Sequence, residues 1–79
     1  MDEEMRKKVE QMVDSLVPDL KPEVARIEAS PATEYHYEDY GALLMGIAPT
    51  REKAQIIALA LIKAGANRKG VTVALQYFY

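Results

Sequence analysis

Residues 30–47 have the sequence SPATEYHYEDYGALLMGI, and the predicted fold class depends on how this stretch is interpreted. Its first four residues are typical of a turn. Residues 34–38 then alternate polar with aromatic side chains, which is the pattern of a half-buried strand. Residues 42–47 are short and apolar, which fits a buried strand. This interpretation favours a protein that contains a β-sheet.

A helix over residues 31–47 is the competing interpretation. It would have Ser30 as its N-cap. The residues that support it by their helical spacing are Tyr40, Leu43, Leu44 and Ile47. Residues 22–30 are ambiguous, because Leu20, Val24 and Ile27 fit a short helix while residues 24–29 alternate as in a strand. We expect a strand there, since residues 30–33 are typical of a turn and the alternating residues 34–38 would complete a hairpin.

Two helices are predicted on either side of this stretch. Residues 2–17 begin with an acidic turn, and Pro18 is expected to end that helix. Its apolar stripe, which we expect to face the core, comprises Met5, Val9, Met12, Val13, Leu16 and Val17. Residues 51–64 form the second helix, with Thr50 as N-cap and Gly65 in position for a C-terminal cap.

The last nine residues, 71–79, alternate in a way that predicts a strand with two largely apolar faces. The expected fold is therefore α+β. It is a single domain over residues 1–79, in the order helix, strand, strand, helix, strand, with a small sheet packed on two helices. The alternative is a mostly helical chain with one C-terminal strand.

Composition limits the classes of function. The chain of 79 residues contains no cysteine, which excludes disulfides, thiolate metal sites and thiol nucleophiles and is typical of a reducing compartment. Its first residues lack the features of a signal peptide, and no apolar run approaches the ~20 residues of a membrane span. We therefore expect a cytoplasmic protein with no membrane partner.

Charge is distributed unevenly along the chain. Residues 1–40 carry eleven acidic and five basic side chains, net −6, whereas residues 41–79 carry one acidic and five basic side chains, net +4. Either the two halves neutralise one another in the fold, or the basic half binds an anionic partner. The candidate anion-binding residues are Thr50, Arg51, Lys53, Arg68 and Lys69.

Motifs for catalysis or metal binding are weak. Glu34, His36 and Glu38 would share one face of a strand, but one histidine and two carboxylates without a fourth ligand match zinc sites poorly. The sequence has neither a phosphate-binding glycine loop nor a clear nucleophile and base. We expect no metal, no cofactor and no enzymatic activity.

The leading hypothesis is a non-catalytic interaction module, of the adaptor or stoichiometric inhibitor type, that binds another protein or itself. Aromatic side chains are favoured at the centres of interfaces. The candidate binding residues are Tyr35, Tyr37, Tyr40, Tyr77 and Phe78. The alternative is a small nucleic-acid-binding protein that uses the basic C-terminal half.

Two features predict a homodimer. Residues 56–62 of the second helix are apolar on every side, so one small chain has difficulty covering them. The predicted strand at 71–79 would offer a free sheet edge to another chain. A two-fold dimer would cover both, with Ile57 and Leu61 as the side chains expected between subunits.

Overall fold

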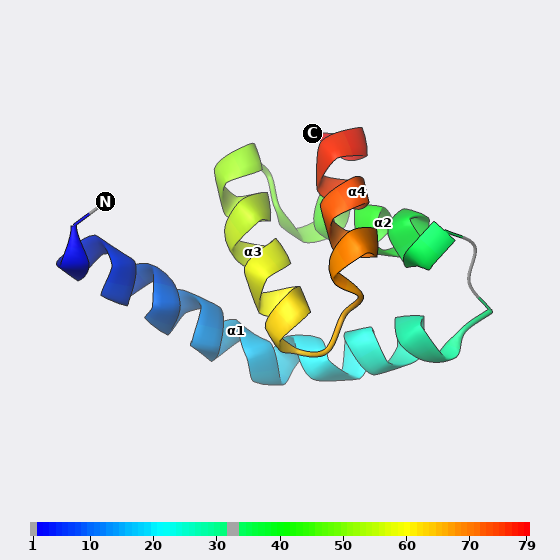
Figure 1. Cartoon of the computed structure of the whole chain (residues 1–79), viewed down its shortest axis with the longest axis horizontal. Coiled ribbons are helices and arrows are strands. Elements are labelled where there is room, and N and C mark those ends of the chain that lie inside the picture. Colours follow the sequence, from blue (N-terminus) through cyan, green and yellow to red (C-terminus); the bar gives the residue numbers. More distant parts are fainter. Residues whose placement is uncertain (1, 32–33) are drawn as a thin grey trace.

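The structure, a computed structural model, describes residues 2–31 and 34–79, most of which are helical. Helix α1 comprises Glu3–Ala29, α2 Tyr37–Ile47, α3 Arg51–Lys63 and α4 Arg68–Phe78, and a 3₁₀ turn, η1, covers Glu34–His36. Figure 1 shows α1 along one side of the molecule, with α3 packed on it, α4 beside α3, and α2 packed against α4. The fold is a small bundle with one long helix.

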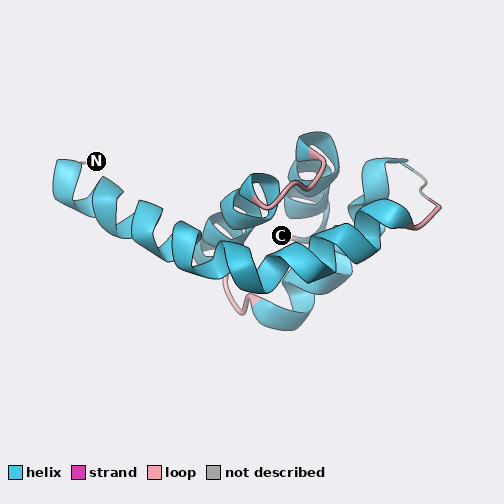
Figure 2. Cartoon of the chain, turned by 90° about the horizontal axis from the view of Figure 1, so that it is seen from below, coloured by secondary structure: helices cyan, strands magenta, loops and turns pink. Residues whose placement is uncertain are grey.

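The predicted α+β fold is wrong, because the described residues contain no strand (Figure 2). Residues 22–29, 42–47 and 71–78, which were predicted to lie in strands, belong to α1, α2 and α4. The alternative, a mostly helical chain with one C-terminal strand, is wrong about the strand, because those residues form α4. Short apolar runs satisfy both periods, and tertiary packing decides between them.

Helix α1 continues through two prolines, so the predicted end at Pro18 is wrong. Pro18 and Pro22 are both exposed residues inside this helix, and each lacks the N–H that would bond the carbonyl four residues earlier. Val24 and Ile27, further along, are buried against the other helices. The burial of this second half of α1 outweighs the local preference for ending the helix.

The core lies where the four helices meet. Its largest fully buried side chains come from each helix in turn, and they are Ile27, Tyr40, Leu44, Leu61 and Val71. Small residues let the helices approach closely, since Ala54, Ala60 and Ala74 are completely buried. Each helix therefore contributes one stripe to a single core.

Helix α3 is predicted correctly in type and in its first residue, and it ends at Lys63, one residue before the predicted end. Thr50 Oγ1 accepts a hydrogen bond from the backbone N–H of Lys53 over 3.2 Å, as expected of an N-cap. Gly65 has a φ of 110°, a conformation that few residues other than glycine adopt, and it follows the last turn. The chain covers much of the apolar run at 56–62 by itself, because α3 packs on α1 and on α4, although Leu59 stays exposed.

Helix α4 replaces the predicted strand at 71–79. Asn67 begins it, since its side-chain oxygen accepts a hydrogen bond from the backbone N–H of Gly70 over 3.1 Å. Val71 and Ala74 face the core at helical spacing. The free sheet edge that supported a homodimer therefore does not exist.

A left-handed turn precedes α2. Glu34, Tyr35 and His36 have φ values of 50°, 60° and 65°, so the predicted strand at 34–38 is wrong. Such a conformation costs about 1–2 kcal/mol per residue for side chains other than glycine. The turn brings the carbonyl oxygen of Tyr35 so close to Gly70 that a Cβ built there would lie 1.8 Å from it. Close packing against a glycine thus accompanies the strained turn.

Candidate interaction surfaces

Tyr40, one of the predicted binding residues, belongs to the core. It is 0% exposed, and its hydroxyl donates a hydrogen bond to the carboxylate of Glu28 on α1. The same carboxylate oxygen accepts the backbone N–H of Asn67 over 3.2 Å. Burial and the bond to Glu28 raise the pKa of the Tyr40 hydroxyl above its ordinary value. This residue joins α1, α2 and the start of α4 rather than facing a partner.

Three of the predicted aromatic residues lie together, and we call Tyr37, Tyr77 and Phe78 the aromatic cluster. The ring centroids of Tyr37 and Tyr77 are 5.8 Å apart, and those of Tyr77 and Phe78 are 5.2 Å apart, both in edge-to-face orientations. Tyr77 is 72% exposed. Phe78 packs over Gly41, where a Cβ would lie 2.1 Å from its ring. The cluster holds α2 and α4 together and leaves one tyrosine at the surface.

Tyr35 lies apart from the aromatic cluster, on the left-handed turn. Its ring is about half exposed, and the Lys69 ammonium nitrogen lies 4.7 Å from the ring centroid. A cation above an aromatic face is weakly stabilising at an exposed site. The five predicted binding residues therefore divide into one core residue, one cluster and one exposed turn residue.

The predicted anion-binding residues do not form one surface. Thr50 caps its own helix, and the Arg51 guanidinium donates to the carbonyl oxygen of Tyr79 over 3.2 Å. That contact places the start of α3 at the end of α4, whereas Arg68 and Lys69 lie at the start of α4. The 11 residues of α4 separate the two groups by roughly 16 Å of helix.

The strand face on which Glu34, His36 and Glu38 were expected to align is replaced by a turn and a helix. His36 is buried while both glutamates are exposed, and its Nδ1 atom lies 3.9 Å from the Asp39 carboxylate without a hydrogen-bond partner. Within residues 2–31 and 34–79, no group of three acidic, histidine or cysteine side chains is placed to hold a metal ion.

An apolar depression lies between α1 and α3. We call this depression the α1–α3 notch, and Figure 1 shows that the first turns of α1 diverge from α3. The notch has a volume of about 130 Å³ and is lined by Met12, Leu16, Lys53, Ile56 and Ile57. Lys53 is the one charged residue among these five, so the notch suits an apolar occupant.

The second depression, the α3–α4 groove, runs along the opposite side of α3. Its volume is about 310 Å³. It is lined by Gln55, Ala58, Leu59, Ile62, Arg68, Val71, Thr72 and Leu75. Leu59 is 53% exposed there, and Arg68 supplies a positive charge at one end. The groove thus combines an apolar floor with a few polar groups, as binding grooves do.

The sequence predicted helix α3, which lines both depressions, but it did not predict that α3 would have a depression on either side. The uninterrupted apolar run at 56–62 was the available signal, since its side chains point toward α1, the core and α4 in turn. Leu61 is completely buried in the chain itself, which places it away from any subunit interface. Ile57 lines the notch and stays available to a partner.

Comparison of the chain with known protein families, curated proteins and solved structures gives no match. Of the helices in the described ranges, none combines the length and the apolar character that crossing a membrane requires.

Proposed function

We propose that this chain is a non-catalytic interaction domain, of the adaptor or stoichiometric inhibitor type, that binds a helical segment of another protein in the α3–α4 groove. The observation that carries the proposal is the exposure of Leu59 in a groove with further apolar side chains along both helices. Amphipathic helices bind grooves of this kind through apolar residues spaced three or four apart.

The polar lining specifies the partner further. Arg68 lies at one end of the groove and belongs to the half of the chain with net charge +4. A carboxylate at the corresponding end of the partner helix would pair with it. Gln55 and Thr72 add hydrogen-bonding groups beside the apolar lining. The favoured partner is therefore an amphipathic helix with an acidic residue at one end of its apolar stripe.

Affinity capture from the native host tests this function with a pair of matched variants. Leu59→Glu introduces a charge into the α3–α4 groove, and Met12→Glu makes the same change at an equally exposed site in the α1–α3 notch. We expect a protein that the wild type and Met12→Glu capture and that Leu59→Glu loses. If Leu59→Glu captures that protein as well as the wild type does, the groove is not the binding site.

Nucleic-acid binding is the second candidate, and one local arrangement favours it. Lys69 lies over the half-exposed ring of Tyr35, and Arg68 is its neighbour in the sequence. A nucleic-acid base could stack on the tyrosine ring while the two cations bind the adjoining phosphates. Acidic Glu34, next to Tyr35, opposes such binding. Mobility shifts at ~50 mM salt test it, since electrostatic binding is strong there. An unshifted probe at micromolar protein would exclude it.

A further inference from the structure

Helix α1 has two apolar faces, one after the other along its length. Val13, Leu20, Val24 and Ile27 are buried against the bundle. Met5 and Met12, which lie off this line, are 53% and 49% exposed. The prediction that the whole stripe faces the core is therefore wrong for its first turns. We call residues 3–12, which extend past α3 in Figure 1, the overhang.

The first half of α1 has the spacing of a helix-pairing seam, since Met5, Val9, Met12 and Leu16 are separated by four, three and four residues, as the a and d positions of a coiled coil are. Met5 and Met12 are the exposed members of this seam, whereas Val9 and Leu16 are half-buried and also pack against the core. Met5 and Met12 expose apolar surface to water, so packing them against another apolar surface would be favourable. The overhang therefore presents a surface that another helix would complete.

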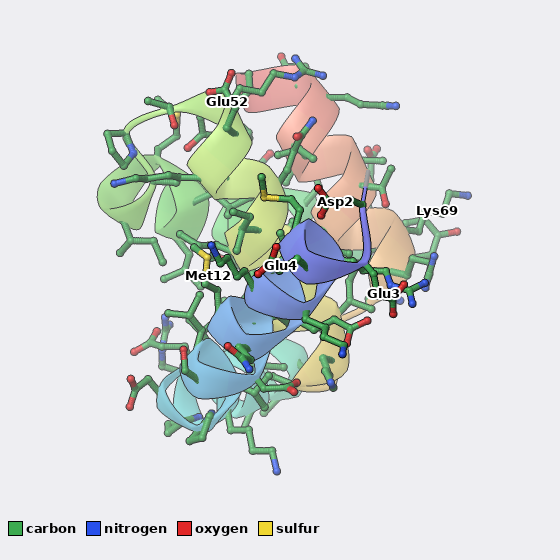
Figure 3. All side chains as sticks on the ribbon, turned by 90° about the vertical axis from the view of Figure 1, so that its left-hand side faces the viewer. Asp2, Glu3, Glu4, Met12, Glu52 and Lys69 are labelled. Carbon is green, nitrogen blue, oxygen red and sulfur yellow. The ribbon has the colours of Figure 1, made fainter. Side chains whose placement is uncertain are left out.

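The overhang and the α1–α3 notch form one continuous surface. Met12 and Leu16 belong to both the seam and the notch, and Ile56 and Ile57 of α3 extend the apolar area. Figure 3 views the tip of α1 end on, with Met12 on the side where it meets α3. Each chain thus carries both a projecting helix and a depression that is open beside it.

We propose that a second copy of this chain occupies the notch, with the two overhangs packed antiparallel about a two-fold axis. A two-fold interface uses the same surface on both subunits, so that surface must be complementary to itself. The overhang and the notch meet this condition, because each copy provides one apolar helix and one apolar depression beside it. The seam spacing favours a helix as the occupant.

Charge complementarity supports the same arrangement. The acidic side chains Asp2, Glu3 and Glu4 lie at the near end of α1 in Figure 3 and form its acidic tip. Asp2 accepts the backbone N–H of Met5 and Glu3 pairs with Arg6. Lys53 is the charged side chain that lines the notch. In an antiparallel pair, the acidic tip of each copy approaches the notch of the other. When the second copy covers the notch, Lys53 would therefore have a carboxylate partner and would not be buried as an isolated charge.

This pairing uses a surface separate from the α3–α4 groove, so it stands or fails independently of the proposed function. Sedimentation equilibrium of the full chain over a range of concentrations measures it. We expect a mass twice the 8.9 kDa of one chain at high concentration. A constant mass of 8.9 kDa at every concentration would overturn the proposal.

Three matched variants locate the interface. Met5→Glu and Met12→Glu should each raise the dimer dissociation constant about 30-fold or more, because a charge at the centre of an interface is strongly unfavourable. Leu59→Glu, with the same exposure as Met5 but in the other groove, should change it less than about threefold. Circular dichroism checks that each variant is folded. If Met12→Glu unfolds, Met5→Glu still tests the interface, because Met5 lies in the exposed first turn of α1.

A charge reversal separates this interface from others. Lys53→Glu should weaken the dimer more than Lys69→Glu, which alters a cation beside Tyr35 instead. Equal effects of the two reversals would overturn the proposed contact with the acidic tip. A dimer that dissociates with Leu59→Glu but not with Met5→Glu would overturn the notch as the interface.

Discussion

The Tyr40 hydroxyl, on α2, donates a hydrogen bond to the Glu28 carboxylate near the end of α1. This bond joins the two helices on either side of the turn that connects them. Glu28 also accepts the backbone N–H of Asn67, the residue that begins α4. One carboxylate thus fixes three segments that are far apart in the sequence. Hydrogen bonds that involve a charged group are stronger than neutral ones.

Replacement of Tyr40 by phenylalanine removes this bond but retains the buried ring. We expect Tyr40→Phe to lower the free energy of unfolding by about 1–3 kcal/mol, because the buried hydroxyl bonds a charged acceptor. Urea denaturation followed by circular dichroism measures the change. A variant as stable as the wild type would show that water satisfies Glu28 equally well.

The raised pKa of Tyr40 predicts a loss of stability in alkali. In the unfolded chain a tyrosine ionises near pH ~10, whereas the buried hydroxyl of the folded chain keeps its proton to higher pH. The unfolded state therefore releases a proton first, and the free energy of unfolding decreases as pH rises above ~10. Denaturation between pH ~9 and ~11 should show a steeper decline for the wild type than for Tyr40→Phe. Parallel curves would contradict this assignment.

Two glycines in helices should respond oppositely to alanine. Gly70→Ala places a methyl group against the backbone oxygen of Tyr35, which cannot rotate away, and we expect a loss of about 2–3 kcal/mol. Gly46→Ala is the control, since a Cβ there meets nothing within 4 Å and should stabilise α2 by about 0.5–1 kcal/mol. Thermal unfolding of both variants checks the signs, and a stable Gly70→Ala would mean that the left-handed turn moves.

The bend in α1 has a testable cost. Pro18→Ala restores a backbone N–H in an exposed part of the helix, so we expect a gain of about 1–2 kcal/mol, reduced by the larger entropy of the unfolded chain. Chemical denaturation measures it. A loss of stability would instead show that the proline bend is needed for α1 to follow the bundle.

Capping residues predicted the fold better than alternation did. Thr50 and Gly65 located α3 correctly because a cap acts through its own local hydrogen bonds and backbone conformation. Asn67 is a comparable signal for α4, but the alternating side chains that follow were given more weight. A cap specifies one conformation, whereas five alternating apolar residues fit either period.

The remaining errors arise from contacts between distant residues. Pro18 is a local signal for the end of a helix, but burial of Val24 and Ile27 carries α1 beyond it. The left-handed turn at Tyr35 coincides with a close approach to Gly70, which is distant in sequence. For the candidate sites, the aromatic residues were identified by type, but their division between core and surface depends on this packing.

The length of α1 has a mechanical consequence. The helix meets the end of α3 near Asp14, which accepts a hydrogen bond from Lys63, and the eleven residues of α1 before that point span roughly 16 Å. A rotation of about 10° at this point would displace the acidic tip by about 3 Å. A small change in the packing of Val13, which is buried beside this point, would therefore become a larger displacement at the N-terminal tip of α1.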